Sequence, residues 1–244
     1  MLTEELLTYI FDRKDHILIP PMRRWLTGSR SFAAFVRTFQ DKIRKKVRVT
    51  QDPETILDLH LEFETAYRLL QEKTLNVSYE PQLAEKVRSA DFAVTFTTSV
   101  TFMLEVTRLR STQQQTEEKA AGTTTSGDRL ADAACSKLGQ FVSQQSNILL
   151  VGIGSLQISQ EEIRSAMLRV QQRAERNDEV FFQRYRFRDR TDFFRHYQRL
   201  SEILVRGGDA TGTSVSLSWV NPQAKYPLPG KVRRVLYRSQ MIGP

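Results

Sequence analysis

A chain of 244 residues with 40% hydrophobic and 26% charged residues has the composition of a globular protein, which excludes a disordered chain. No run approaches the ~18 apolar residues that a membrane-spanning helix requires, and the acidic start MLTEELLTYIF is unlike a secretory signal. We therefore expect a cytoplasmic protein with no membrane partner. The single cysteine, Cys135, excludes an intrachain disulfide and a thiolate metal cluster, and we expect it to pack on a helix.

The formal net charge of +8 is distributed unevenly along the chain. Residues 13–48 contain 11 Lys/Arg against 2 acids, residues 49–160 contain 9 against 14, and residues 161–244 contain 16 against 9. An acidic middle between two basic flanks suits a polyanion that the flanks hold over an anionic, metal-loaded centre. Solvated basic helix faces would give similar counts, so the charge pattern favours a nucleic-acid partner without requiring one.

The first 50 residues predict two helices separated by a proline pair. We expect a short amphipathic helix at residues 2–11, a break at Pro20-Pro21, and then the helix SFAAFVRTFQDKIRKKV, with Ser31 as its N-cap. This second helix ends in a basic run that either complements the helix dipole or contacts nucleic-acid phosphates. The run consists of Lys42, Arg44, Lys45, Lys46 and Arg48.

Asp52-Pro53-Glu54 predicts the start of the next helix, because an acid at the N-cap is followed by proline at the first helical position. Glu62 lies in line with an otherwise apolar or small stripe of this helix. Such a glutamate either reaches water at the edge of the stripe or belongs to a functional site.

Three strands are predicted next, at residues 75–79, 92–97 and 100–106. The short connection around Thr98 predicts a hairpin, and antiparallel pairing about it places Asp91 opposite Glu105. A buried acid costs several kcal/mol unless it is paired, protonated or bound to a cation. Two isolated carboxylates on neighbouring apolar strands therefore suggest a divalent-metal site.

A crossover unit follows the hairpin. Residues 111–127 are polar and aperiodic and predict a loop, Asp128 is expected to cap a helix over 128–144, and NILLVGIG predicts a central strand with both faces covered. The helix between two strands makes the strand ending at Val106 and the strand starting at Ile148 parallel.

The C-terminal third predicts helices at 161–177 and 190–207, a strand at 214–220 and a basic tail, with Gly207-Gly208 ending the second helix. Aromatic residues from Phe181 to Tyr197 are interspersed with arginines. They either stack on nucleic-acid bases or form apolar helix faces with arginines reaching to water.

The order of elements and four short motifs resemble the PD-(D/E)XK nuclease superfamily over residues 54–153. Ser89-Ala90-Asp91 is similar to its Pro-Asp motif, and Glu105-Val106-Thr107 stands where the superfamily has Glu-X-Lys. Glu62 resembles the first-helix glutamate of many members. The segment KLGQF, with Lys137 and Gln140, resembles the helix that often brings a Lys or Gln to the site.

This resemblance implies an α/β, restriction-endonuclease-like core of one helix, a three-stranded meander, a crossover helix and a strand, with added terminal helices. It implies a hydrolase that cuts phosphodiester bonds in DNA. Its cofactor would be Mg²⁺ or Mn²⁺, held by Asp91, Glu105, the Val106 carbonyl and Glu62.

Thr107 departs from the motif, because threonine has neither the charge nor the reach of the usual lysine. Lys137 could project to the same site, whereas Arg108 is expected to point to the opposite face of its strand and cannot act as a base. Either Lys137 maintains catalysis, or the chain is a catalytically inactive relative that acts as a nucleic-acid-binding or regulatory protein.

We divide the chain into a basic helical extension at 1–50, a core at 51–155 and a C-terminal part at 156–244 packed on the same core. DNA is the expected partner, and the sequence leaves open whether the protein forms a homodimer.

Overall fold

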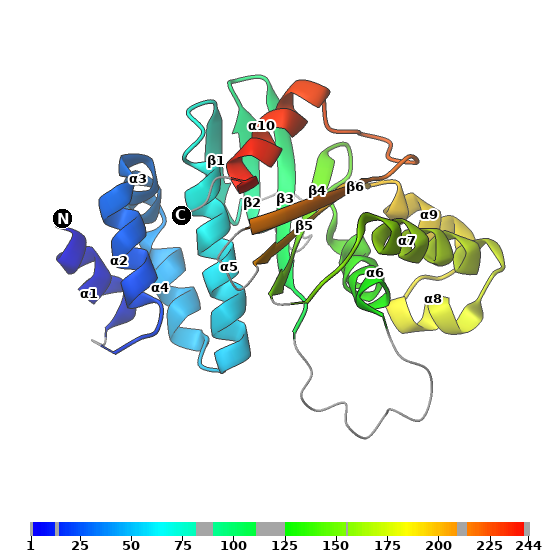
Figure 1. Ribbon diagram of the computed structural model, residues 1–244, viewed down its shortest axis with the longest axis horizontal. Helices are drawn as coiled ribbons and strands as arrows, with labels where there is room; N and C mark the ends of the chain where they lie inside the picture. Colours follow the sequence, from blue (N-terminus) through cyan, green and yellow to red (C-terminus); the bar gives the residue numbers. More distant parts are fainter. Residues whose placement is uncertain are drawn as a thin grey trace.

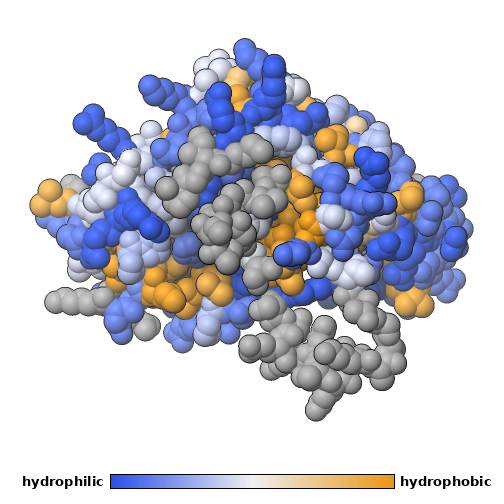
Figure 2. Space-filling view, in the orientation of Figure 1, coloured by the Kyte–Doolittle hydropathy of each residue, from blue (hydrophilic) through white to orange (hydrophobic). Residues whose placement is uncertain are grey.

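The computed structural model describes residues 2–12, 15–81, 90–110, 125–154, 156–208 and 214–241. It shows an α/β fold in three layers, with helices α1–α5 and α10 on one side of a mixed sheet and α6–α9 on the other (Figure 1). Two separate apolar clusters fill the spaces between the sheet and these helices. Figure 2 shows hydrophilic residues over most of the visible face, with hydrophobic ones in small patches. No helix within the described residues is long and apolar enough to cross a membrane.

The N-terminal helices differ from the prediction at their boundaries. Pro20 and Pro21 lie in the first turn of a helix instead of breaking the chain, because proline lacks the N–H that the first turn cannot use. Ser29, not Ser31, is the next N-cap, and its hydroxyl accepts the Phe32 N–H at 3.2 Å. The long helix predicted from there is divided in two near Phe39. The helices are α1 (Thr3–Phe11), α2 (Ile19–Gly28), α3 (Arg30–Thr38) and α4 (Gln40–Val49).

Helix α5 (Pro53–Leu69) begins at the predicted N-cap, where Asp52 accepts the Thr55 N–H at 3.0 Å. It packs across the sheet very closely: a Cβ added at Gly152 would lie 2.6 Å from a methyl carbon of Leu61. Glu62 follows directly on this helix and is buried, so the predicted stripe is confirmed as an inward face.

The sheet has the order β1-β2-β3-β4-β5-β6. The first three strands form an antiparallel meander, β3, β4 and β5 are parallel, and β6 is antiparallel to β5. The predicted hairpin register is confirmed, since Phe96 pairs with Val100 and Phe92 with Leu104; one further step places Asp91 opposite Glu105. The strands are β1 (Leu75–Tyr79), β2 (Phe92–Phe96), β3 (Val100–Arg108), β4 (Ser146–Gly154), β5 (Leu200–Gly208) and β6 (Ser214–Val220).

The crossover helix α6 (Ser126–Lys137) joins the parallel strands β3 and β4, as predicted, and ends in a 3₁₀ turn, Leu138–Gln140. Its N-cap is Thr125, and Asp128 is the third helical residue of a capping box. The predicted loop at 111–127 lies mostly outside the described residues.

The C-terminal third differs most from the prediction. The helix predicted over 190–207 ends at Tyr197, and residues from Leu200 onward form β5, which pairs with β4 and β6. Gly207 and Gly208 therefore end a strand, and the basic tail is a helix. The helices here are α7 (Gln160–Glu175), α8 (Glu179–Tyr185), α9 (Arg190–Tyr197) and α10 (Gly230–Met241).

Candidate active site

Side chains from both helical layers meet at the end of the β2–β3 hairpin. We call this group the acid–lysine cluster, and it comprises four carboxylates and two ammonium groups that are linked by ion pairs or by direct charge interaction. Its members are Glu62, Glu80, Asp91, Glu105, Lys46 and Lys137.

Asp91 lies at the centre of the cluster, just before β2. Its Oδ2 accepts the backbone N–H of Val106 at 2.8 Å, which fixes the carboxylate against β3. Burial raises the pKa of Asp91 well above its usual value, and the negative charges of Glu62 and Glu105 raise it further. The side chain nevertheless remains 17% exposed, so water reaches it.

Lys46 of α4 places its ammonium among three of the carboxylates. The Nζ atom lies 2.7 and 2.8 Å from the two oxygens of Glu62, 3.3 Å from Glu80 Oε1 and 3.8 Å from Asp91 Oδ1. Burial by itself would lower the pKa of Lys46, but the attraction of these carboxylates outweighs it and the pKa is raised. Lys46 therefore keeps its positive charge at a position where three carboxylates attract a cation.

Glu62 binds the Lys46 ammonium through both of its carboxylate oxygens. Its Oε1 also accepts a hydrogen bond from the Tyr79 hydroxyl at 2.6 Å, so both of its oxygens are already engaged. Burial raises the pKa of Glu62, and Lys46 acts in the opposite direction without cancelling the effect. Burial and the charge of Glu62 also raise the pKa of Tyr79, which stays a neutral hydrogen-bond donor.

Lys137 approaches the cluster from the opposite layer, as the sequence suggested. Its Nζ lies 2.6 Å from Glu105 Oε1, but no ion pair with Asp91 is found among the described residues. Arg108 points to the other face of β3, as predicted, and bonds to Glu54 and Asp58 of α5.

Thr107 and Gln140 are half-buried near these elements, and no hydrogen bond found in the described part of the chain joins either of them to the cluster. Ser89 of the first motif lies outside the described residues.

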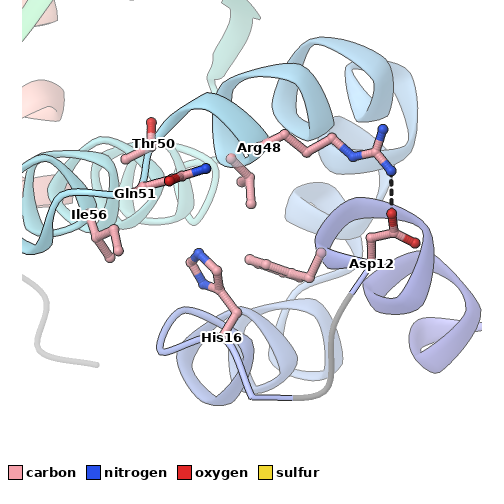
Figure 3. A pocket seen from close by; sticks show the side chains of 8 residues that line it. Asp12, His16, Arg48, Thr50, Gln51 and Ile56 are labelled. Atoms are coloured by element: carbon pink, nitrogen blue, oxygen red, sulfur yellow. Dashed lines mark hydrogen bonds and ion pairs between the residues drawn. The ribbon is translucent and has the colours of Figure 1, made fainter.

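The basic run of α4 is mostly bonded within the protein. Lys42 Nζ donates to the carbonyls of Tyr79 and Glu80 at 3.1 and 2.7 Å, and the Arg44 guanidinium lies 4.3 Å from the ring centre of Tyr9. Arg48 pairs with Asp12 beside a hollow of about 440 Å³ (Figure 3). Lys45 is exposed, so the predicted phosphate contact stays a prediction that fits this lysine best.

The aromatic residues of the C-terminal third fill the core between α6–α9 and the sheet. Five of them are buried there, which favours the apolar-face interpretation over base stacking. They are Phe181, Phe182, Phe187, Phe193 and Tyr197. Cys135 is buried on α6, as expected.

The charge of the cluster and the oxygen ligands that it offers suit a divalent cation, but their arrangement restricts how many carboxylates can bind it. Four carboxylates face two ammonium groups, so the acids outnumber the cations by two when all six groups are ionised. Magnesium prefers carboxylate oxygens and often uses only one or two from the protein, with waters and substrate phosphate completing its shell. Within the described ranges, no group of three or more His, Cys, Asp or Glu side chains is arranged to hold a metal. The residues therefore fit a two-carboxylate site better than the three-carboxylate site that includes Glu62.

No protein-family model, curated protein or solved structure matches this chain. The functional conclusion consequently depends on the geometry of the cluster itself.

Proposed function

We propose that this protein is a divalent-metal-dependent nuclease with a restriction-endonuclease-like core that hydrolyses phosphodiester bonds in DNA. The observation that carries the proposal is the convergence of Asp91 and Glu105 on neighbouring strands, with a pKa of Asp91 raised by burial and by nearby carboxylates. The order α5, β1 to β3, α6 and β4, with β3 and β4 parallel, supports the same core.

Asp91, Glu105 and the Val106 carbonyl would hold Mg²⁺ or Mn²⁺. The N–H and C=O of one strand residue point to the same edge, so the bond from Val106 N–H to Asp91 directs this carbonyl toward the Asp91 side of β3. The bound ion would stabilise charge on the phosphate and lower the pKa of a water.

Lys46 is the best replacement for the lysine that is absent at Thr107. Among the ammonium groups of the cluster it is the one within 4 Å of Asp91, whereas Lys137 pairs with Glu105. Glu62 holds Lys46 in place and acts as a positioning residue. In this proposal Lys46 would orient the attacking water or the phosphate, and Lys137 would neutralise part of the charge on Glu105, one of the residues that would hold the metal.

The test is cleavage of supercoiled plasmid in Mg²⁺ or Mn²⁺ by the wild type and by Asp91→Asn and Glu105→Gln, which keep side-chain shape. Removing a metal ligand from the reacting centre is expected to lower the rate by about 10² to 10⁴, and Asp12→Asn, an exposed acid near the N-terminus, serves as the matched control. Absence of wild-type cleavage, or equal cleavage by all variants, would overturn the proposal.

A second candidate function is a nucleic-acid-binding or regulatory protein that keeps the fold without catalysis. The two lysines bonded to Glu62 and Glu105 favour it, because they already neutralise part of the cluster. It predicts DNA binding that weakens with salt and a melting temperature that Mg²⁺ leaves unchanged.

A further inference from the structure

A charged hollow, separate from the acid–lysine cluster, lies between the end of β3 and helices α6, α7 and α8. Its volume is about 690 Å³, and we call it the arginine hollow. Three acids outside its lining, Glu54, Asp58 and Asp178, pair with arginines of the hollow. Six arginines and two acids are among the lining residues themselves. These are Arg108, Arg110, Arg129, Arg169, Arg173 and Arg184, with Asp128 and Asp132.

Four of the arginines keep roughly half of their side chains exposed while an acid fixes their direction. Arg169 bonds to Asp128 at 2.6 Å and Arg184 to Asp132 at 2.5 Å, with exposed fractions of 50% and 60%. Arg110 and Arg173 are held in the same way by acids that are not lining residues of the hollow. A guanidinium has five N–H donors, so these pairs leave donors available for a phosphate.

We propose that the arginine hollow binds the phosphodiester backbone of a nucleic-acid strand. Arginine binds phosphate by two parallel hydrogen bonds, and several exposed guanidinium groups around one hollow match a chain of phosphates better than a carboxylate or a neutral ligand. Aromatic contacts stiffen the wall: Arg173 lies 5.0 Å from the ring centre of Phe181 and Arg184 lies 5.4 Å from that of Tyr185.

The hollow is also within reach of the cluster along shared elements. Glu105 precedes Arg108 by three residues of β3, which spans about 10 Å, while the Arg108 side chain itself bonds to α5 on the other face of the sheet. Asp132 precedes Lys137 by five residues of α6, which spans about 8 Å. About three phosphates of one duplex strand cover such a distance. The choice of a nucleic acid as the ligand rests on the proposed function, and the hollow would seat the strand whose phosphate lies at Asp91 and Glu105.

The test is fluorescence anisotropy of a labelled 20-base-pair duplex and of its single strand with the full chain in EDTA, so that binding is measured without cleavage. Arg169→Gln/Arg184→Gln is compared with Arg164→Gln/Arg190→Gln, a pair of equally charged, exposed arginines outside the hollow. All four changes keep the side-chain stem, and circular dichroism confirms folding. The hollow variant is expected to bind at least about tenfold more weakly at low salt, with the slope of log K against log salt reduced by about 2.

Equal weakening in both double variants would overturn the inference, because it would reduce the effect to net charge. A wild type that binds no oligonucleotide but melts at a higher temperature with pyrophosphate, and loses that shift in the hollow variant, would assign the hollow to a free phosphate compound and also overturn it. Since the assay contains no metal, a wild type that binds DNA through the hollow but never cleaves it would contradict the proposed function alone.

Discussion

Replacing Lys46 by methionine should destabilise the protein in a manner that depends on pH and on Mg²⁺. Methionine keeps most of the apolar stem and removes only the ammonium. That ammonium lies 2.7 Å from Glu62, 3.3 Å from Glu80 and 3.8 Å from Asp91. At an effective dielectric constant of 20, Coulomb attraction at these distances is about 4 to 6 kcal/mol each, and the desolvation of the charges offsets most of it. We expect a net loss of about 3 to 4 kcal/mol in the free energy of unfolding at pH 8.

The pH dependence follows from the two acids that surround Lys46. The pKa values of Glu62 and Asp91 are raised above their usual 4.5 and 3.8 in the folded protein, so the folded state binds protons more readily than the unfolded one. The stabilisation that comes from protonating these two acids is complete below their usual pKa values. It is lost as the pH rises through their raised pKa values. Without Lys46 both pKa values rise further. The difference between wild type and variant should therefore be small near pH 4 and grow steadily toward pH 8.

The measurement is urea unfolding followed by circular dichroism at several pH values, with and without Mg²⁺. Lys45→Met, the exposed neighbour on α4, is the control and should change stability by less than about 0.5 kcal/mol. Mg²⁺ at a hundred times its Kd adds about 2.7 kcal/mol of stability, and it should stabilise the Lys46→Met variant more than the wild type, since the ammonium no longer competes. A loss that does not vary with pH would refute the electrostatic reasoning, and a variant that Mg²⁺ does not stabilise would refute the metal site.

Three further predictions concern stability and can be measured by urea or thermal unfolding. Ser29→Ala should cost about 1 kcal/mol because Ser29 is the observed N-cap of α3, whereas Ser31→Ala within the helix should cost nothing or stabilise slightly. Gly152→Ala should cost about 1 to 3 kcal/mol, since the new methyl group would overlap the leucine of α5 that packs on it. Arg233→Met should cost about 3 to 5 kcal/mol, because it leaves the fully buried Glu202 carboxylate without its ion-pair partner, and Glu202→Gln in the same chain should recover part of this loss.

The elements that local chemistry determines were predictable from the sequence. The register of the β2–β3 hairpin follows from a short turn and the two-residue period of side chains, so the facing of Asp91 and Glu105 could be predicted. The start of α5 follows from Asp52 and the proline after it, and β4 follows from a continuous apolar run.

The features that the sequence did not predict depend on contacts between distant parts of the chain. The residues Leu200, Ile203 and Leu204 have the spacing of a helix face, but they form β5, where Leu204 packs in one apolar cluster and Ile203 in the other. A short segment buried on both faces of a sheet can imitate a helix, and periodicity alone does not separate the two. The sequence likewise did not predict the role of Lys46, because this role depends on which face of α4 packs against α5.

The position of Lys46 did leave a trace in the sequence. Lys42 and Lys46 are four residues apart and each precedes a buried residue of α4, Ile43 or Val47, so both lie along the edge of the inward stripe. A lysine at that edge can bury its stem and extend its ammonium across the neighbouring layer. Only the position of Glu62 on the facing helix shows that this ammonium is bound instead of solvated.

The absence of a lysine at Thr107 is consequently not equivalent to the absence of a lysine from the cluster. One cation arrives from α4 and another from α6, so the two helical layers both contribute to the end of the hairpin. Lys42 ties α4 to the end of β1 through two backbone carbonyls, which holds Lys46 at the carboxylates. Because α4 belongs to the basic extension at residues 1–50, a chain that begins after this extension would keep both strand carboxylates but lose the ammonium closest to Asp91. Such a chain would also lose the buried residues that α1–α4 contribute to the apolar cluster with α5 and the sheet, so Lys46→Met, and not truncation, isolates the effect of the missing charge.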